Sequence, residues 1–228
     1  MKGVTSLKNW HFSDYLLVFV LASMIISLGL TVKAILTTSG AAREQELFLL
    51  LEIILGIVIL LLPRGVAWLG HFELPAILYT LFIVFIYGAV YLGTIYHFYS
   101  LVPLWDKLLH VGSAMLLGCL GYALFGLFTP KKQLRQLSPF MLSLFAFTFG
   151  LALGVFWEFY EFTFDGLLGL NMQRFMVGNT LLHGRAALMD TMGDLFADAL
   201  GALIIVIIGY CGIKRNPRWL DKFLFRKK

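Results

Sequence analysis

Residues 189–202 read MDTMGDLFADALGA and place three aspartates, Asp190, Asp194 and Asp198, four residues apart just before a long apolar run. On an α-helix this spacing stacks the three carboxylates along one face. Burying a carboxylate in hydrocarbon is costly, so three on one face of a membrane helix need cations, protons or water beside them. We therefore look for function along this stripe.

The composition of the chain predicts a membrane protein. Of its 228 residues, 60% are hydrophobic and 14% are charged, which excludes an ordinary soluble globular domain. Six apolar segments reach or approach the roughly 20 residues that a helix needs to cross the hydrocarbon core. We predict an all-α, polytopic bundle of six transmembrane helices that forms a single integral membrane domain, residues 1–228. The predicted spans are 15–36, 46–62, 74–95, 106–128, 139–164 and 190–212, and a basic tail follows at 213–228.

The positions of the prolines agree with this division. A proline inside a helix removes a hydrogen bond, whereas one between helices costs little. Pro63, Pro103, Pro130 and Pro217 fall between or after the predicted spans, and Pro139 begins one. The second span is accordingly expected to end just before Pro63.

The distribution of lysine and arginine predicts that both termini are cytoplasmic. With the N-terminus inside, five of the 18 basic residues fall on the outer side and the other thirteen inside, as the positive-inside rule requires. Topology thus accounts for the net charge of +5, and we expect no nucleic-acid partner. The outer five are Lys33, Arg43, Lys107, Arg174 and Arg185.

The expected partner is the lipid bilayer. The tail interleaves basic residues with Trp219, Leu220, Phe223, Leu224 and Phe225. This pattern is typical of a helix that lies on anionic lipid. We therefore predict that the tail anchors the chain at the cytoplasmic surface.

The same topology gathers acidic residues from the last three spans at one face of the membrane. Small residues on these spans, such as Gly118, Gly154 and Gly201, favour close helix packing. At about 1.5 Å rise per residue the acidic positions occupy only the outer half of the bilayer or its edge. Seven of the 13 acidic residues lie here: Asp106, Glu158, Glu161, Asp165, Asp190, Asp194 and Asp198.

Four motifs in the second half of the chain carry a family resemblance. They are DKLLH at 106–110, WEFYEF at 157–162, GLNMQ at 169–173 and DTMGDLFADALGA at 190–202. They resemble the YjdF-type family of uncharacterised bacterial inner-membrane proteins, and more distantly the VanZ-like proteins, some of which are associated with glycopeptide resistance. The resemblance implies a multi-pass protein of the bacterial cytoplasmic membrane and supplies no established reaction.

The residue types themselves indicate a metal site. One histidine with several carboxylates and no nearby thiol suits Mg²⁺, Mn²⁺, Fe²⁺ or Zn²⁺. Residues one turn apart on α-helices can reach one ion together. We predict one outward-opening pocket with the candidate ligands Asp106, His110, Glu158, Glu161, Asp194 and Asp198.

A metal held there would suit hydrolysis of a lipid-linked or envelope substrate, because it polarises a phosphoryl or carbonyl oxygen and activates water. A carboxylate not bound to the metal, from Glu158, Glu161 or Asp198, would act as the base. The loop 166–189 contains Arg174 and Arg185, which are candidates to bind an anionic head group.

Two other functions use the same residues. Stepped carboxylates and a histidine could form a proton relay or cation path of a transporter. They could also hold a structural ion in an envelope protein or accessory protein without turnover. The sequence leaves open whether the chain is an enzyme.

Overall fold

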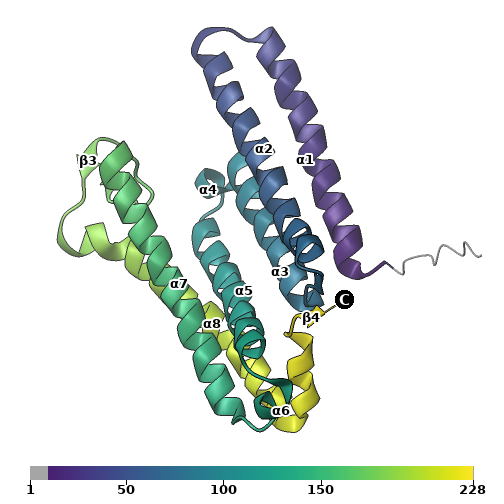
Figure 1. Cartoon of the computed structure of the whole chain (residues 1–228). Helices are drawn as coiled ribbons and strands as arrows, with labels where there is room; N and C mark the ends of the chain where they lie inside the picture. The colour runs from purple at the N-terminus through teal and green to yellow at the C-terminus, as the bar shows by residue number, and fades with distance from the viewer. Residues whose placement is uncertain (1–9, 228) are drawn as a thin grey trace, which may run out of the picture.

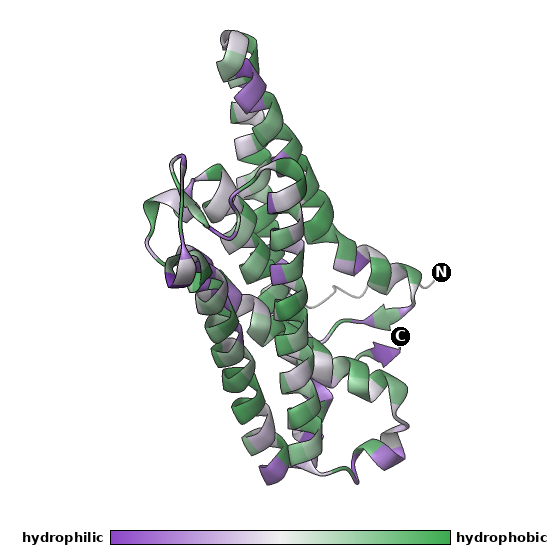
Figure 2. Cartoon of the chain, turned by 90° about the vertical axis from the view of Figure 1, so that its left-hand side faces the viewer, coloured by the Kyte–Doolittle hydropathy of each residue, from purple (hydrophilic) through white to green (hydrophobic). Residues whose placement is uncertain are grey.

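The computed structural model describes residues 10–227 and is largely helical (Figure 1). Six of its helices are long and apolar enough to cross a membrane, which confirms the predicted polytopic helix bundle. Figure 2 shows hydrophobic residues along the middle of these helices and hydrophilic residues gathered toward ends and loops. The six are α1 (Phe12–Thr37), α2 (Gly40–Leu69), α3 (Ala76–Ile86) continued by the π-helix η1 (Tyr87–Ile95), α5 (Trp105–Phe128), α7 (Pro139–Leu168) and α8 (Met189–Arg215).

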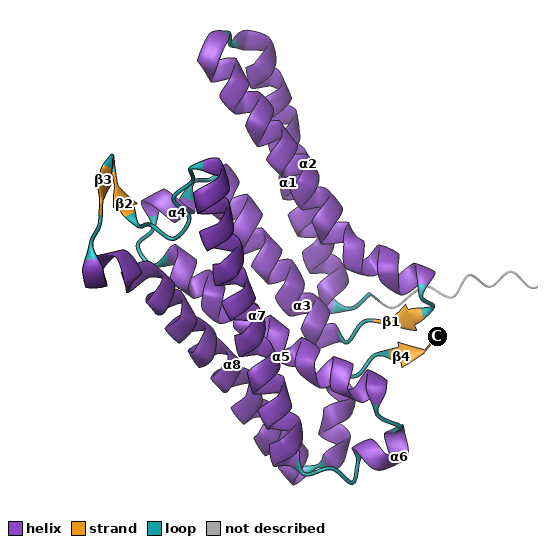
Figure 3. Cartoon of the chain, turned by 60° about the vertical axis from the view of Figure 1, so that its left-hand side comes forward, coloured by secondary structure: helices purple, strands orange, loops and turns teal. Residues whose placement is uncertain are grey.

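Short helices and strands lie in the connections between the long helices and after the last of them (Figure 3). At one end of the bundle β1 (Phe72–Glu73) pairs in antiparallel fashion with β4 (Arg226–Lys227), so the C-terminus lies beside the α2–α3 connection. At the other end β2 (Met176–Val177) and β3 (Thr180–Leu181) form a hairpin between α7 and α8. The remaining short elements are α4 (Phe98–Leu101), α6 (Lys131–Leu134), η2 (Gly184–Leu188) and η3 (Pro217–Lys222).

The second span is longer than predicted, because α2 runs through Pro63 and ends at Leu69. The prediction that Pro63 lies outside a helix was wrong. Proline removes one backbone hydrogen bond, and contacts just beyond it support the continued helix. Arg64 forms an ion pair with Asp14 of α1 and its guanidinium lies 5.2 Å from the Tyr79 ring centroid. Tertiary contacts therefore offset the local cost of Pro63.

The fifth span also extends further, to Leu168 instead of residue 164. Its first turn is capped by Ser138, whose hydroxyl accepts a hydrogen bond from the Phe140 amide at 3.2 Å. Its last turn ends at Gly169, which adopts a left-handed conformation with φ +65° and donates its amide to the Asp165 carbonyl. Such a C-terminal glycine is a common way to stop a helix. The extra turn keeps Asp165 within α7.

Helices α5, α7 and α8 pack closely against one another, as predicted for the last three spans. Glycines allow this approach because their contacts leave no space for a side chain. A Cβ on Gly201 would overlap the Val111 carbonyl, and one on Gly121 would lie 2.9 Å from the Ala146 Cα. The predicted close-packed group is therefore confirmed, and it fixes the relative positions of the three helices that carry the acidic residues.

Helices α1, α2 and α3 form a second group around an apolar core. Leu17, Val20, Met24, Leu60 and Ile83 are buried there. The two groups meet where α3 contacts α5. Burial of apolar surface against neighbouring helices thus accounts for both halves of the bundle.

The tail differs from the prediction of a helix lying on lipid. After α8 it forms the short 3₁₀ helix η3, and Leu220 and Phe223 are buried against the bundle. The Phe223 ring stacks on Tyr122 of α5 with centroids 4.8 Å apart. A pattern of basic and apolar residues suits packing on a protein surface as well as on a lipid surface. Here the apolar side chains pack on protein. Arg218, Lys222 and Arg226 are exposed, and their contact with anionic lipid stays a prediction.

The α6 segment and the C-terminal segment lie at one end of the bundle, and the α7–α8 loop lies at the opposite end (Figure 1). This arrangement agrees with a bundle whose connections alternate between two sides. The cytoplasmic location of the termini stays a prediction. Lys2, Lys8 and Lys228, which contribute to the charge asymmetry, lie outside the described residues.

Candidate functional site

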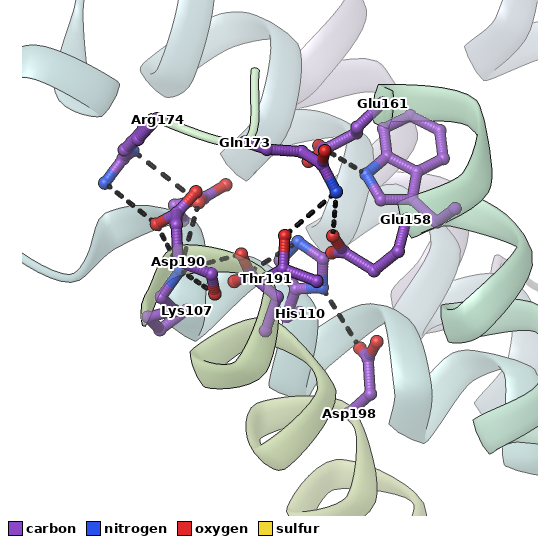
Figure 4. A network of polar contacts seen from close by, with 12 residues as sticks. Lys107, His110, Glu158, Glu161, Gln173, Arg174, Asp190, Thr191 and Asp198 are labelled. Carbon is purple, nitrogen blue, oxygen red and sulfur yellow. Dashed lines mark hydrogen bonds and ion pairs between the residues drawn. The ribbon is translucent and has the colours of Figure 1, made fainter. Parts of the chain in front are cut away.

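Six of the seven predicted carboxylates come together where α5 begins, α7 ends and α8 begins, and the seventh, Asp165, lies one turn further along α7. Because residues one turn apart share a helix face, each helix directs its polar residues to the same place (Figure 4). We call these seven residues the carboxylate cluster. Five of them are buried: Glu158, Glu161, Asp165, Asp194 and Asp198.

Lys107 lies within the carboxylate cluster, and the sequence analysis did not assign it a role. Its ammonium group is 2.6 Å from Asp190 Oδ1, 2.7 Å from Asp194 Oδ2 and 3.7 Å from Asp106 Oδ2. It also donates to the Asp190 backbone carbonyl at 3.2 Å. Lys107 therefore joins the first turn of α5 to the first two turns of α8. Its position beside Asp106 in DKLLH was the only signal in the sequence.

His110 lies between two aspartates of α8. Its Nδ1 is 3.2 Å from Asp198 Oδ1, and its Nε2 is 3.5 Å from Asp194 Oδ1. If Nδ1 carries the proton and donates to Asp198, Nε2 presents a lone pair toward Asp194. A histidine held by a carboxylate in this way is the usual arrangement of a histidine metal ligand.

Asp106, His110 and Asp194 form a compact group of ligand atoms. One such atom from each residue lies within 4.8 Å of the other two. This His/Asp/Asp group comprises three of the six predicted ligands. Asp198 contacts the opposite nitrogen of His110, so it occupies a supporting position behind the group.

Glu158 and Glu161 approach from α7, on another side of His110 (Figure 4). The Gln173 side-chain amide donates to Glu158 Oε2 at 3.1 Å and to the Thr191 hydroxyl at 2.9 Å. The Trp157 indole donates to Glu161 Oε1 at 2.8 Å. Both glutamates thus have defined orientations, and their role as metal ligands stays a prediction.

The α7–α8 loop is folded over the site by Asp165. Its carboxylate accepts hydrogen bonds from the backbone amide of Met172 at 2.7 Å and from that of Gln173 at 2.9 Å. These bonds bring Gln173 to Glu158 and place Arg174 next to α5 and α8. Arg174 lies 3.6 Å from Asp106 Oδ2 and 3.8 Å from Asp190 Oδ1. The loop therefore covers the site.

The two predicted substrate-binding arginines differ in position. The Arg174 side chain is 45% exposed and borders two cavities, so it can reach a ligand without leaving its place. Arg185 is exposed in η2, and none of the described contacts that define the site includes it. Its proposed role has no support from position.

Several buried carboxylate oxygens lack a hydrogen-bond donor among the described residues. They are Glu158 Oε1, Asp190 Oδ2, Asp194 Oδ1 and Asp198 Oδ2. Such atoms are costly unless a cation, proton or water serves them. The nearby permanent cations are Lys107 and Arg174, so negative charge exceeds positive charge at the site. The site thus has the negative charge and the unpaired carboxylate oxygens that could coordinate a cation.

Gly154 makes room for one of these oxygens. A Cβ built on Gly154 would overlap the Asp198 carboxylate. The close approach of α7 and α8 at this glycine therefore sets how near Asp198 lies to His110. The role of Gly154 could not be separated in the sequence from ordinary helix packing.

A cavity of about 580 Å³ opens beside His110 between α5 and α7. Its polar lining residues include Asp106, Asp198, Glu161 and Arg174, and its apolar ones include leucines of both helices, Phe85 and Trp157. A larger cavity of about 990 Å³ is lined by the first turns of α2 and by the segment that follows η1. Tyr99 and Arg174 border both cavities.

Tyr99 lies in α4, outside the membrane-spanning helices. Burial raises the pKa of Tyr99 to about 12, with a further contribution from the negative charges of Asp106 and Glu161. The Tyr99 phenol therefore stays protonated at neutral pH. It can donate a hydrogen bond at the boundary of the cavities and cannot act as a base there.

The fold and the site together define an integral multi-pass membrane protein with a buried polar site at one end of its bundle. The chain belongs to the family described as "Predicted membrane protein (DUF2238)", which matches residues 15–215. It is also 32% identical over 120 residues to a protein of Thermotoga maritima that is described only as uncharacterized. That alignment covers 52% of this chain and 54% of the relative, so the chain spans about half of the relative's length.

No solved structure matches the chain. The family match agrees with an uncharacterised membrane-protein family, and the bacterial relative fits a location in the inner membrane. These comparisons do not show the more distant VanZ-like resemblance, and they assign no reaction.

Proposed function

We propose that the chain binds one divalent metal ion at Asp106, His110 and Asp194 and uses it for hydrolysis of a lipid-linked or envelope substrate. The observation that carries the proposal is the pair formed by His110 Nε2 and Asp194 Oδ1. These atoms lie 3.5 Å apart, and Asp194 Oδ1 accepts no hydrogen bond from the described residues. Two ligand atoms with bonds of about 2.0–2.2 Å to a shared ion would have such a separation.

The surrounding residues fit this role. Asp198 would hold the Nδ1 proton of His110, and Lys107 would hold the other oxygen of Asp194, so both ligands would be oriented before the ion arrives. Burial of the carboxylates would make a cation more favourable than it is in water. The ligand set of one imidazole and two carboxylates suits Zn²⁺, Mn²⁺ or Fe²⁺ best and Mg²⁺ less well.

The metal would supply Lewis-acid activation of water and of the substrate oxygen. Glu161 lines the cavity next to the metal group and would take one proton from the attacking water. The water oxygen then forms a bond to the phosphorus or carbonyl carbon, and the bond from that atom to the leaving oxygen breaks. The proton held by Glu161 would pass to the leaving oxygen. Arg174 would balance the negative charge of the substrate.

Metal content is the test. Purified protein, incubated with each candidate ion and washed, should retain close to one ion per chain by elemental analysis. His110→Ala and Asp194→Asn should each lower retention by about tenfold or more, since loss of even a supporting residue costs 10–100-fold in affinity. His71→Ala and Asp221→Asn are matched controls, because both residues lie outside the site.

Wild-type retention in both site variants would disprove the metal site. Failure of the unmodified protein to retain any of the four ions would disprove it as well. Glu161→Gln is expected to keep the ion, because the proposed base is not a ligand. Loss of the ion in Glu161→Gln would place that residue among the ligands and assign the base to another group.

A transporter is the second candidate, because unpaired buried oxygens of Glu158 and Asp198 could also carry protons. Proteoliposomes with an imposed pH gradient would report this function. Proton flux that is lost in Asp198→Asn and does not require a divalent ion would favour the transporter over the enzyme. An envelope or accessory protein without turnover would show a retained ion, no flux and no hydrolysis.

A further inference from the structure

The cavity beside the site has a shape that identifies a class of ligand. Its lining on α5 includes Asp106, Leu109, Ser113, Leu116 and Leu117. These residues share one helix face because successive positions from Asp106 to Leu116 are three or four residues apart and Leu117 follows directly. From Asp106 to Leu117 this face extends about 16 Å at 1.5 Å per residue. The cavity therefore runs along the helix, from the polar site toward the middle of the span.

Helix α7 forms the opposite wall. Leu153, Gly154, Trp157 and Glu161 line it. Because α7 runs opposite to α5, Glu161 lies at the site and Leu153 lies toward the middle of the span. Phe85 of α3 completes the apolar part. We call this space between α5 and α7 the groove. Its apolar end is lined by Phe85, Leu116, Leu117 and Leu153, and its polar part extends from Asp106 and Glu161 as far as Asp198, which contacts Gly154.

The polar end of the groove is lined by Arg174 and by two members of the proposed metal group, Asp106 and His110. The third member, Asp194, lies 3.5 Å from His110 Nε2. The ion pairs of Arg174 with described residues are long, at 3.6 and 3.8 Å, and its side chain is 45% exposed. A guanidinium with free donors binds phosphate well. Without a metal the carboxylates would repel an anion, whereas a divalent ion would offset that repulsion.

We propose that the groove binds one hydrocarbon chain of a membrane amphiphile whose phosphate head group lies at Arg174 and the metal. The proposal rests on the proposed function, because the metal makes the polar end attractive to phosphate. The volume of about 580 Å³ lies within the range of ligand pockets. The chain lies between Leu116, Leu117 and Leu153, and the head group faces the larger, more polar cavity on the other side of Arg174 and Tyr99.

The polar and apolar ends of the groove determine which part of the ligand provides selectivity. A hydrocarbon chain that enters the groove leaves the lipid phase, which is already apolar. It therefore gains packing contacts and little hydrophobic free energy. Selection therefore depends mainly on the head group. A single-chain amphiphile with a phosphate head group should therefore bind better than one with the same chain and a cationic head group.

Photo-crosslinking of metal-loaded protein tests this proposal. The probe is a dodecyl phosphate with a diazirine near the end of its chain, and labelled residues are identified by mass spectrometry. Labels are expected on Leu116, Leu117 or Leu153. Leu117→Trp fills the groove and should reduce labelling about tenfold, whereas Leu108→Trp, at an exposed position of the same helix, should leave labelling unchanged. Arg174→Met should reduce labelling severalfold.

Two comparison ligands identify the source of recognition. A probe with the same chain and a trimethylammonium head should label the groove at least about fivefold less. Equal labelling would mean that bulk lipid fills the groove, and it would overturn the proposal. Inorganic phosphate should compete only weakly, because it lacks the chain. Competition at the concentration of the probe itself would show that free phosphate is the ligand and would also overturn it.

Folding and metal content are measured for each variant so that failures can be separated. If Leu117→Trp loses helical structure, Leu153→Phe replaces it as the variant that narrows the groove. Unchanged labelling in a folded groove variant would overturn the proposal even when the metal is present. If the unmodified protein retains no metal but the phosphate probe still labels the groove selectively, the proposed function fails and the ligand class stands.

Discussion

Replacing Lys107 with methionine tests how the carboxylate cluster is stabilised. The substitution keeps most of the side-chain length and removes the ammonium group that lies 2.6 Å from Asp190 and 2.7 Å from Asp194. Asp194 is only 1% exposed, so water cannot replace the lost partner. Removal of one member of a buried ion pair typically costs about 3–5 kcal/mol.

The expected loss lies near the lower value, because the Lys107 side chain is 21% exposed. A loss of about 3 kcal/mol should lower the midpoint of thermal unfolding by about 6–12 °C for a chain of this length. Circular dichroism of the detergent-solubilised protein measures that midpoint. Lys132→Met, at an exposed position, is the matched control.

A second substitution makes the experiment specific for charge. Adding Asp190→Asn to Lys107→Met removes one carboxylate that has lost its partner. The double variant should therefore recover part of the lost stability, and the coupling between the two positions should appear in a double-mutant cycle. A midpoint shift no larger than that of Lys132→Met, or no coupling with Asp190, would refute the role of Lys107.

Three further predictions follow from the fold. Gly154→Ala should cost about 1–3 kcal/mol from overpacking and should lower metal retention, whereas Gly166→Ala, whose Cβ would meet no atom within 4 Å, should change neither quantity. Phe223→Ala should lower the free energy of unfolding by about 3–5 kcal/mol, measured by thermal unfolding; a change below about 1 kcal/mol would mean that the tail does not pack as described. In a cysteine-free background an impermeant reagent applied from outside should label a cysteine at Asn179 and should not label one at Lys132. The opposite result would place the site on the cytoplasmic side.

The fold was accessible from the sequence because its main signals are local. An apolar segment of about 20 residues is sufficient to predict a membrane helix, and all six were found. The four-residue spacing of Asp190, Asp194 and Asp198 also fixes their common helix face before any tertiary contact is considered. Helix ends were less accurate, since α2 continues past Pro63 into a turn where Arg64 pairs with Asp14 of another helix, and local sequence does not reveal such a contact.

The site was predicted only in part, because its details depend on how helices meet. His110 and the α8 aspartates could be grouped from topology alone. The position of Lys107 between Asp190 and Asp194 could not, since it requires the distance between α5 and α8. The tail illustrates the same limit, because a row of basic and aromatic residues does not distinguish a lipid surface from the protein surface on which Phe223 packs.

The polar residues stop at a definite depth, and this bears on the choice between an enzyme and a conducting path. Beyond Asp198, the buried residues of α8 among those described are Gly201, Ala202, Ile205, Val206, Gly209 and Ile213. In the same part of the bundle the Tyr122 and Ser143 hydroxyls are 2.6 Å apart and satisfy each other. A proton or cation that reached Asp198 would therefore meet apolar side chains where a relay needs ionisable groups or water. The apolar buried face of α8 beyond Asp198 therefore argues against a conducting path along this helix and supports the proposal of a site that holds an ion at one end of the bundle.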